Sequence, residues 1–255
     1  MKHGDFTGLA ADYARFRAGY APQVAAAILG YTERRPAGID AADVGAGTGI
    51  WTRTLAALGL HSVVAVEPND DMREQGIETS RGTQILWRKG SAEATGLPNS
   101  SIDLVSMASS FHWADFNKAC DEFVRILRPR GVFVALWNPR MIEVNPLFVE
   151  IEAEVTRLKP DIRRISSGRS GITERLTDML SAKPQFGEVL YLEARHSVLQ
   201  MPSEYMGAWR SVNDLQVQLG PELFRRFLDF TEQRIAGLTA IETTYATRAW
   251  VARRT

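Results

Sequence analysis

A glycine-rich turn between a short apolar run and a helical pattern constrains the fold of this chain more than any other stretch. Residues 39–44 predict a buried strand, and residues 51–60 predict a helix with apolar positions available for a core. Gly45, Gly47 and Gly49 stand between them at every second position. Because glycine tolerates positive φ and has no side chain, another molecule can approach the main chain of such a turn closely. The stretch therefore predicts an open α/β sheet with a ligand site at the carboxyl end of this strand.

The spacing of the glycines narrows the class of ligand. A dinucleotide site requires G-x-G-x-x-G, followed by a helix whose N-terminus holds the pyrophosphate. Here the pattern is G-x-G-x-G, and no Lys-Ser/Thr pair follows it as in a phosphate-binding loop. Asp43, two residues before the first glycine, would repel a phosphate and attract an ammonium group. The turn therefore indicates a nucleotide-like ligand that presents an ammonium group here.

An acidic residue ends the next predicted strand. Residues 62–67 form an apolar run that ends in Glu67, 18 residues after Gly49 and close to the expected spacing of about 20. A carboxylate at this place in the dinucleotide-binding fold accepts hydrogen bonds from the ribose, and we expect the same of Glu67. The alternative is a solvated strand end. Met72, in the helix predicted after Pro68, is expected to cover an adenine ring.

Taken in order along the chain, these motifs resemble those of the class I S-adenosyl-L-methionine (SAM) methyltransferases. Residues 43–49, Asp-Val-Gly-Ala-Gly-Thr-Gly, are similar to motif I of that family, and residues 97–113, which end in Phe-His-Trp, are similar to motif IV. The opening Tyr-x-x-x-Arg segment, the Trp-Asn pair after the fifth predicted strand and residues 168–170 match one branch, which includes trans-aconitate methyltransferases and related natural-product enzymes. The resemblance implies SAM as cofactor and a small-molecule substrate.

The resemblance also assigns site residues. Those expected to bind SAM come from the N-terminal lid, the glycine turn and the ends of the next three strands: Tyr13, Arg17, Asp43, Gly45, Ala46, Gly47, Thr48, Glu67, Met72, Ser91, Ala92, Glu93 and Ser109. The family usually has an Asp where Ser91 stands, and that Asp bonds the adenine amino group. Those expected to bind the substrate are Trp113, Trp137, Asn138 and Arg169. A guanidinium such as that of Arg169 can clamp a carboxylate through two hydrogen bonds.

Methyl transfer from a sulfonium requires little chemistry from side chains. It is an in-line displacement with a good leaving group, so the protein mainly aligns the reactants and excludes water. No metal is expected. His112 is the candidate general base, because an imidazole with a pKa of about 6.5 can take up a proton at neutral pH. The alternative is a structural histidine at the end of the strand, and His196 is expected to be structural.

Seven strands are expected: residues 39–44, 62–67, 83–88, a central strand before His112, and residues 131–137, 187–197 and 241–253. The predicted fold is α/β, with a Rossmann-like, seven-stranded and mostly parallel sheet flanked by helices. A helical cap is expected from insertions after strands 5 and 6. We expect one domain: lid helices in residues 1–34, a SAM-binding core in 39–138, and cap insertions in 139–186 and 201–238. Two of the cap helices are predicted at 202–215 and 221–238.

Composition excludes several classes of partner. The 255 residues are 45% apolar and 24% charged with zero net charge, so no basic footprint for nucleic acid is visible. No apolar run approaches the ~18 residues of a membrane helix, and the first residues do not resemble a signal peptide. The single cysteine, Cys120, excludes an intrachain disulfide. A cytoplasmic protein, monomeric or homodimeric, is therefore expected.

Three hypotheses about function remain open. The leading one is SAM-dependent methyl transfer to a small, carboxylated metabolite. A second keeps SAM but directs attack to another of its electrophilic carbons, with release of methylthioadenosine. A third, from a different class, is a SAM-binding regulatory or assembly subunit without turnover. A nicotinamide dehydrogenase is the least favoured, and fold alone does not separate these functions.

Overall fold

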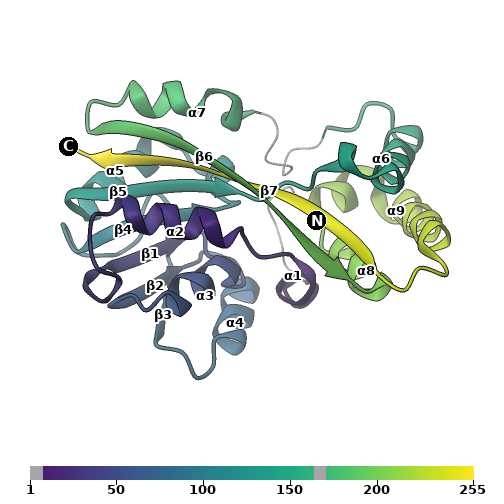
Figure 1. The fold of residues 1–255 in the computed structure, drawn as a ribbon, viewed down its shortest axis with the longest axis horizontal. Coiled ribbons are helices and arrows are strands. Elements are labelled where there is room, and N and C mark those ends of the chain that lie inside the picture. Colours follow the sequence, from purple (N-terminus) through teal and green to yellow (C-terminus); the bar gives the residue numbers. More distant parts are fainter. Residues whose placement is uncertain (1–7, 164–170) are drawn as a thin grey trace.

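The computed structural model describes residues 8–163 and 171–255, and its strands form one seven-stranded sheet (Figure 1). The strands are β1 (Asp40–Val44), β2 (Ser62–Val66), β3 (Ile85–Arg88), β4 (Ile102–Ala108), β5 (Leu127–Trp137), β6 (Phe186–Gln200) and β7 (Ile241–Arg254). Their order is β3-β2-β1-β4-β5-β7-β6. The first five strands pair in parallel, and β7 is antiparallel to both β5 and β6. The expected Rossmann-like, mostly parallel sheet flanked by helices is confirmed.

Helices occupy the crossover connections of this sheet. The α-helices are α1 (Ala10–Phe16), α2 (Pro22–Tyr31), α3 (Ile50–Ala57), α4 (Asp70–Thr79), α5 (Phe116–Ile126), α6 (Pro146–Leu158), α7 (Ile172–Ser181), α8 (Pro202–Arg210) and α9 (Asn213–Ile235). Three short 3-10 helices are η1 (Pro36–Gly38), η2 (Phe111–Trp113) and η3 (Ile142–Val144). Parallel strands require such connections, since a tight turn cannot bring the chain back to the same end of the sheet.

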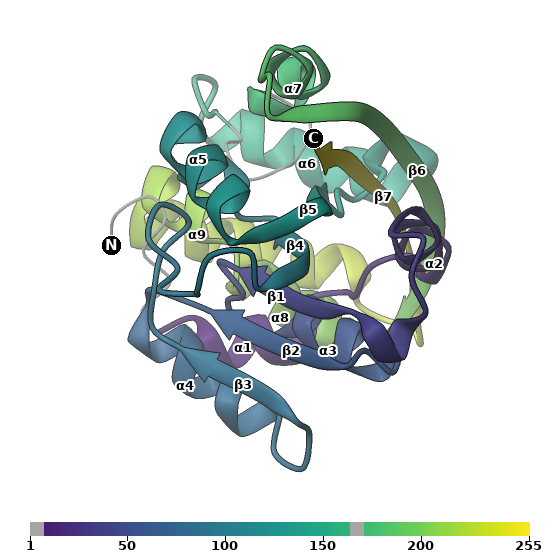
Figure 2. The same cartoon turned by 90° about the vertical axis from the view of Figure 1, so that its left-hand side faces the viewer.

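Both faces of the sheet are covered (Figure 2). On one face, α5 and α7 pack against the strands through residues such as Phe123 and Leu176, while α2 and α3 cover the other face through residues such as Ile28 and Leu55. Strand β4 is consequently buried along almost its whole length, and β5 is buried from Gly131 to Trp137, where residues 132–137 are all apolar.

A helical cap stands at one end of the molecule, where the antiparallel ribbon of β6 and β7 extends (Figure 1). Helices α6, α8 and α9 share a core of their own, which includes Phe148, Tyr205, Trp209 and Phe227. The aromatic rings pack directly: Phe148 stacks on Tyr205 at 5.5 Å, and Trp209 meets Phe227 edge to face at 4.8 Å. This separate core makes the cap a defined wall opposite the sheet.

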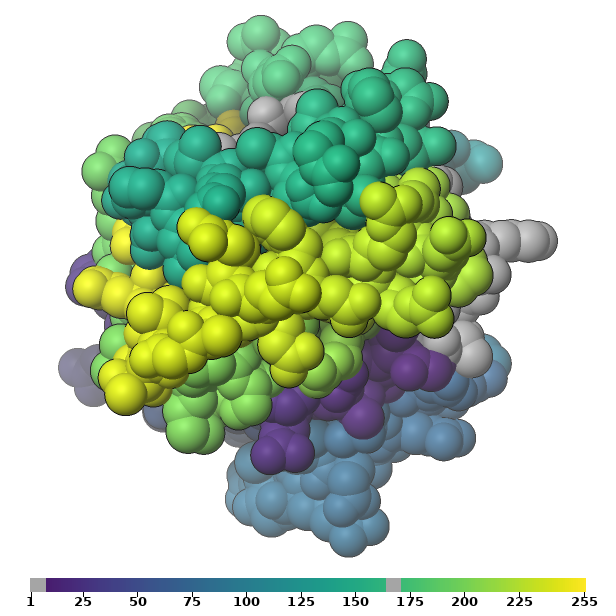
Figure 3. Space-filling view, turned by 90° about the vertical axis from the view of Figure 1, so that its right-hand side faces the viewer, coloured from purple at the N-terminus to yellow at the C-terminus, as the bar shows by residue number. Residues whose placement is uncertain are grey.

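The N-terminal helix α1 lies between the cap and helix α4 (Figure 3). At its C-terminal end, the ring of Phe16 is packed so closely on α8 that a Cβ placed on Gly207 would lie 2.2 Å from it. At the other end, the amide of Gly8 donates a hydrogen bond to Asp71 in the first turn of α4 (3.2 Å). Helix α1 therefore connects the core of the protein to its cap.

The structure corrects three details of the expected layout. Helix α8 ends at Arg210, and α9 begins at Asn213 and bends at Gly220, where φ is 70° ahead of Pro221. Strand β5 begins at Leu127 rather than at residue 131, with a register shift against β4. Helix α7, expected in the cap, packs on the sheet because its apolar side chains fit between α5 and the β6–β7 ribbon.

Candidate functional site

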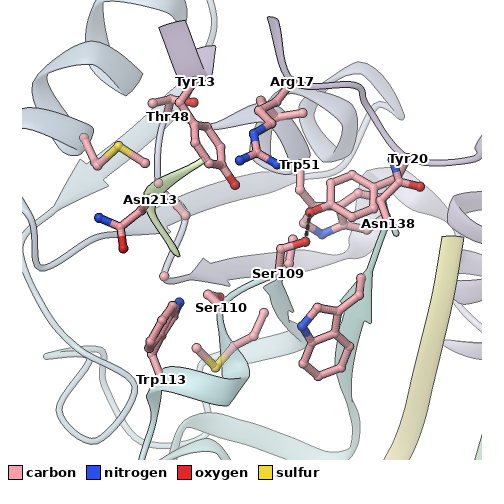
Figure 4. A pocket seen from close by; sticks show the side chains of 18 of the residues that line it. Tyr13, Arg17, Tyr20, Thr48, Trp51, Ser109, Ser110, Trp113, Asn138 and Asn213 are labelled. Atoms are coloured by element: carbon pink, nitrogen blue, oxygen red, sulfur yellow. Dashed lines mark hydrogen bonds between the residues drawn. The ribbon is translucent and has the colours of Figure 1, made fainter. Parts of the chain in front are cut away.

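A cavity of about 610 Å³ lies at the carboxyl ends of the central strands, between the sheet, helix α1 and the cap. Its wall includes main chain of the glycine turn, side chains from the ends of β2, β4 and β5, the lid segment before α2, and residues of α6, α8, α9 and β7. Figure 4 shows side chains from these separate parts of the chain around one common space. The position agrees with the rule that open α/β sheets bind ligands beyond the carboxyl ends of their strands.

The glycine turn presents bare main chain to this cavity. Gly45 (φ 65°), Gly47 (φ 56°) and Gly49 (φ 79°) all adopt the left-handed region that other residues avoid. The amides of Gly45 and Ala46 donate to the carbonyl of Val66 at 2.8 and 3.1 Å, which holds the turn against the end of β2. The expected tight turn is therefore present, and Gly45, Ala46, Gly47 and Thr48 line the cavity.

Glu67 is joined to the glycine turn by hydrogen bonds. Its two carboxylate oxygens accept from the amides of Gly47 (2.8 Å) and Asn69 (2.9 Å). The residue is only 6% exposed and lines the cavity, and burial raises the pKa of its carboxyl group. Each carboxylate oxygen has a further lone pair that can accept from a ligand hydroxyl.

Asp43 does not line the cavity. Its carboxylate is fully buried behind the turn, where it accepts from Thr52 Oγ1 (2.6 Å) and Ser106 Oγ (3.2 Å). Burial raises the pKa of this carboxyl group to about 7. The side chain thus joins β1 to α3 and β4, and the expected direct contact with a ligand ammonium is not formed by this residue.

A second wall of the cavity comes from the segments after β2 and β3. Met72, Ser91, Ala92 and Glu93 line it, as expected for the adenine end of a nucleoside ligand. The amide of Met72 donates to Asn69 Oδ1 (3.0 Å), which caps α4. The Glu93 carboxylate accepts from the amide of residue 115 at 2.9 Å, so it also anchors the start of α5.

The lid side chains contact both the cap and the central strand. Tyr13 and Arg17 line the cavity, and the Arg17 guanidinium donates to Ser211 after α8 through Nε to Oγ (2.8 Å) and a terminal nitrogen to the carbonyl (3.1 Å). The Tyr20 hydroxyl is hydrogen-bonded to Ser109 Oγ at 2.9 Å (Figure 4). Arg17 therefore holds the lid to the cap, while Tyr20 holds it to the end of β4.

The aromatic residues expected on the substrate side also line the cavity. Trp113 and Trp137 do so, together with Asn138, whose amide nitrogen donates to the carbonyl of Gly19 (2.8 Å) and whose Oδ1 accepts from Thr247 Oγ1 (2.7 Å). Asn138 is thus held between the lid and β7. Arg169 lies outside the described residues.

His112 is not arranged as a general base. It is not part of the cavity wall, and its Nδ1 accepts a hydrogen bond from Trp137 Nε1 at 3.2 Å. A neutral imidazole has one acceptor nitrogen, and here the indole occupies it. Burial lowers the pKa of this histidine to about 4, although the nearby Asp214 carboxylate opposes the shift. A second histidine considered from the sequence, His196, bonds the carbonyl of Gly19 through Nε2 (3.0 Å), a structural contact.

Several cavity residues were not singled out from the sequence. Those at the cofactor side and the lid are Tyr20, Trp51, Asn69 and Ser110, and those at the cap side include Arg140, Glu152, Asn213 and Tyr245. The Arg140 guanidinium lies 4.0 Å from the ring centre of Trp209. Tyr20 stands within the lid motif and Arg140 two residues after the Trp-Asn pair, so proximity to a motif was the available signal. Ser110 likewise lies within residues 97–113, and Trp51 and Asn69 each follow a motif residue by two positions. The remaining cap-side residues had no such signal.

The described residues, 8–163 and 171–255, also bear on metal binding and on membrane spans. No group of three or more His, Cys, Asp or Glu side chains there is placed to hold a metal ion. Within the same ranges, every helix is too short or too polar to cross a membrane.

Residues 42–135 match the family model of a methyltransferase domain. An uncharacterized methyltransferase of Mycobacterium tuberculosis is 36% identical over 128 residues, which cover 50% of this chain and 49% of that protein. The match thus spans about half the length of the curated relatives. The family model's residues 42–135 include the glycine turn that lines the cavity.

Solved structures resemble the chain over most of its length. A protein from Anaeromyxobacter dehalogenans, named provisionally as a type II methyltransferase, has a TM-score of 0.65 at 23% identity, covering 93% of this chain and 98% of its own. A phosphoethanolamine N-methyltransferase of Haemonchus contortus, in complex with SAM, has a TM-score of 0.55 at 13% identity and covers 98% of this chain and 57% of its own. At these identities the likeness concerns the fold.

Proposed function

We propose that this chain, whose residues 42–135 are a class I methyltransferase domain with SAM as cofactor, transfers the methyl group of SAM to a small molecule. One observation carries the proposal. A single cavity joins the glycine turn and Glu67 on the core side to a wall built by the cap and by β7. Its volume of about 610 Å³ falls within the roughly 300–1,000 Å³ that is typical of small-molecule sites.

The residues on the core side fit SAM. Gly45 and Gly47 offer main chain without side chains, which suits close approach of the methionine part. Glu67 is positioned to accept from the ribose hydroxyls, and Met72 with Ala92 provides an apolar surface for the adenine ring. Bound SAM would supply the electrophilic methyl carbon of its sulfonium, and the remaining requirements fall on the protein.

Alignment and exclusion of water are the chemical tasks of this site. The lid segment closes one side of the cavity and is held at both ends, by Tyr20 to Ser109 and by Arg17 to Ser211. Holding two reactants in line in this way can contribute roughly 7–11 kcal/mol to lowering a barrier. This fixed enclosure supports methyl transfer over simple binding of SAM. Binding of SAM alone would not need the second wall that the cap and β7 provide.

The acceptor is proposed to be a carboxylated metabolite. Arg140 lines the cap side of the cavity, and its guanidinium rests over Trp209, whose ring is fully buried. The chain around it is held to β7, since the amide of Met141 donates to the carbonyl of Thr244 at 2.9 Å. A guanidinium that is already held in place loses less conformational entropy when it pairs with a carboxylate. This favours a methyl acceptor that carries a negative charge. This agrees with the resemblance to the trans-aconitate methyltransferase branch.

Calorimetry with SAM tests the cofactor site first. Glu67→Gln keeps one oxygen acceptor and replaces the other by an amide nitrogen, which cannot accept. Loss of hydrogen bonds to the charged group should weaken SAM binding by about 1.5–3 kcal/mol, or roughly 10- to 150-fold in affinity. Asp70→Asn is the matched control, because Asp70 is the nearby exposed acid that pairs with Arg73 and Lys89 outside the cavity. Equal SAM affinity of Glu67→Gln and wild type would reject the ribose assignment.

Product analysis tests the reaction. The protein is incubated with SAM and a panel of small carboxylic acids, and the nucleoside products are separated by mass. S-adenosylhomocysteine that forms only in the presence of an acid supports the proposal. Methylthioadenosine would instead indicate attack at another carbon of SAM, and tight SAM binding without any product would favour a non-catalytic subunit.

A further inference from the structure

A histidine lies between two of the tryptophans that line the cavity. His112 sits in the middle of η2, directly after the end of β4, and its Nδ1 accepts a hydrogen bond from Trp137 Nε1 (3.2 Å) at the end of β5. On its other side, the imidazole ring is 4.5 Å from the ring of Trp113, tilted by 45°. His112 itself does not reach the cavity, so it contacts the ligand space only through the two indoles.

The hydrogen bond determines the tautomer of the histidine. An indole N–H can only donate, so Nδ1 must be the acceptor and the ring proton must be on Nε2. That Nε2 atom is buried and makes no hydrogen bond within the described part of the chain. Retaining a buried donor without a partner is unfavourable for the fold alone. An apolar ring at this position would avoid the unpaired donor. A histidine is therefore best explained by a need for the hydrogen-bond acceptor at Nδ1.

The indole of Trp137, which donates to His112, is also restrained by packing. Trp137 is 2% exposed, and its ring meets the ring of Trp250 on β7 edge to face at 5.6 Å. Trp113 is 39% exposed, and its ring contacts the imidazole of the neighbouring His112. One partly buried side chain, which does not line the cavity, therefore contacts both tryptophans.

We propose that His112 is a positioning residue, which accepts the indole N–H of Trp137, supports the ring of Trp113 and thereby sets the wall against which the methyl acceptor is aligned. The inference rests on the proposed methyl transfer, because it concerns the acceptor side of the same cavity. It also makes a structural statement that holds with or without turnover.

Three substitutions separate the acceptor atom from the rest of the ring. In His112→Asn the side-chain amide oxygen can occupy the place of Nδ1, whereas in His112→Gln the amide lies near the place of Nε2. His112→Leu has no acceptor at either place. Thermal melting checks that each variant folds, and His61→Asn is the control, since His61 is an exposed histidine far from the cavity, at the start of β2.

The first readout is the indole N–H spectrum of protein labelled with ¹⁵N-tryptophan, in which Trp137→Phe identifies one of the six signals. The Trp137 signal should move and exchange faster with solvent in the Leu and Gln variants, and it should stay close to its wild-type position in the Asn variant. An unchanged Trp137 signal in folded His112→Leu would overturn the proposal, whatever the enzyme's activity.

The second readout is steady-state kinetics with the acid found in the product screen. A misplaced wall should lower kcat/KM for the acceptor by up to about 10²-fold in the Leu variant, with SAM affinity unchanged and most activity restored in the Asn variant. If His112 were instead the general base, Asn and Leu would lose activity equally and the pH profile of kcat would lose its acidic limb. Absence of turnover in wild type would contradict the proposed function, while the indole spectra would still decide the positioning role.

Discussion

Alanine at Gly45 should destabilise the protein through two separable effects. The first is backbone conformation, since φ at Gly45 is 65° and an L side chain in the left-handed region costs roughly 1–2 kcal/mol. The second is space. A Cβ at this position would lie 2.7 Å from Ser110 Oγ and 2.8 Å from Ser110 Cβ. Rotation of the Ser110 hydroxyl relieves the contact with Oγ but not the contact with Cβ. An overpacking cost of about 1–3 kcal/mol should therefore add to the conformational cost.

Gly59 isolates the conformational effect. Its φ is 74°, and a Cβ placed there would meet nothing within 4 Å. Alanine at Gly45 and alanine at Gly59 reduce the conformational entropy of the unfolded chain equally. That contribution therefore cancels when the two variants are compared. Gly59→Ala should therefore cost roughly 1–2 kcal/mol, and Gly45→Ala roughly 2–5 kcal/mol.

Urea unfolding of both variants gives the two free energies, with m-values compared to check that the transitions remain alike. Ser110→Gly removes the two atoms nearest to the new Cβ and leaves Met107 Cε at 3.3 Å, so the double variant Gly45→Ala/Ser110→Gly should recover most of the packing cost in a double-mutant cycle. Equal costs for Gly45→Ala and Gly59→Ala, within about 0.5 kcal/mol, would refute the steric argument.

Two further predictions concern the buried acid and the lid. The pKa of Asp43 is raised to about 7 by burial, so its contribution to stability is complete below its unfolded value near 3.8 and is lost as pH rises through about 7. Asp43→Asn should remove this loss. The free energy of unfolding of wild type should therefore fall relative to that of the variant between pH 4 and 8, by up to about 4 kcal/mol. If the urea midpoints of wild type and variant changed with pH in the same way, the assignment would be contradicted. A Cβ on Gly207 would lie 2.2 Å from the ring of Phe16, so Gly207→Ala should displace α1 from the cap and speed SAM release. Hydrogen exchange should then increase in α1, and Phe16→Ala in the same chain should partly reverse the change; unchanged exchange in α1 would show that the ring moves aside without displacing the helix.

The sequence alone identified the part of the site that depends on local backbone requirements. Gly45, Gly47 and Gly49 after a strand permit a tight turn with positive φ, which the structure contains, and this turn specifies where a ligand can approach. The strand that ends in Glu67 lies next to β1, and parallel pairing brings its end to the same edge of the sheet. Both features follow from residues close together in the chain, so the class of cofactor could be recognised without coordinates.

The roles of individual side chains at this edge depended on contacts between distant segments. Asp43 is adjacent to the turn in sequence, yet its side chain points toward α3 and β4, because the packing of those elements decides which side of the strand is enclosed. His112 has the residue type of a general base, but Trp137, from the next strand, occupies its acceptor nitrogen. The side of the cavity that includes Arg140 and Tyr245 is assembled from the cap, the segment after β5 and the last strand. Such contacts leave no periodic or spacing signal in the sequence, since burial and hydrogen-bond partners are properties of the packed tertiary structure.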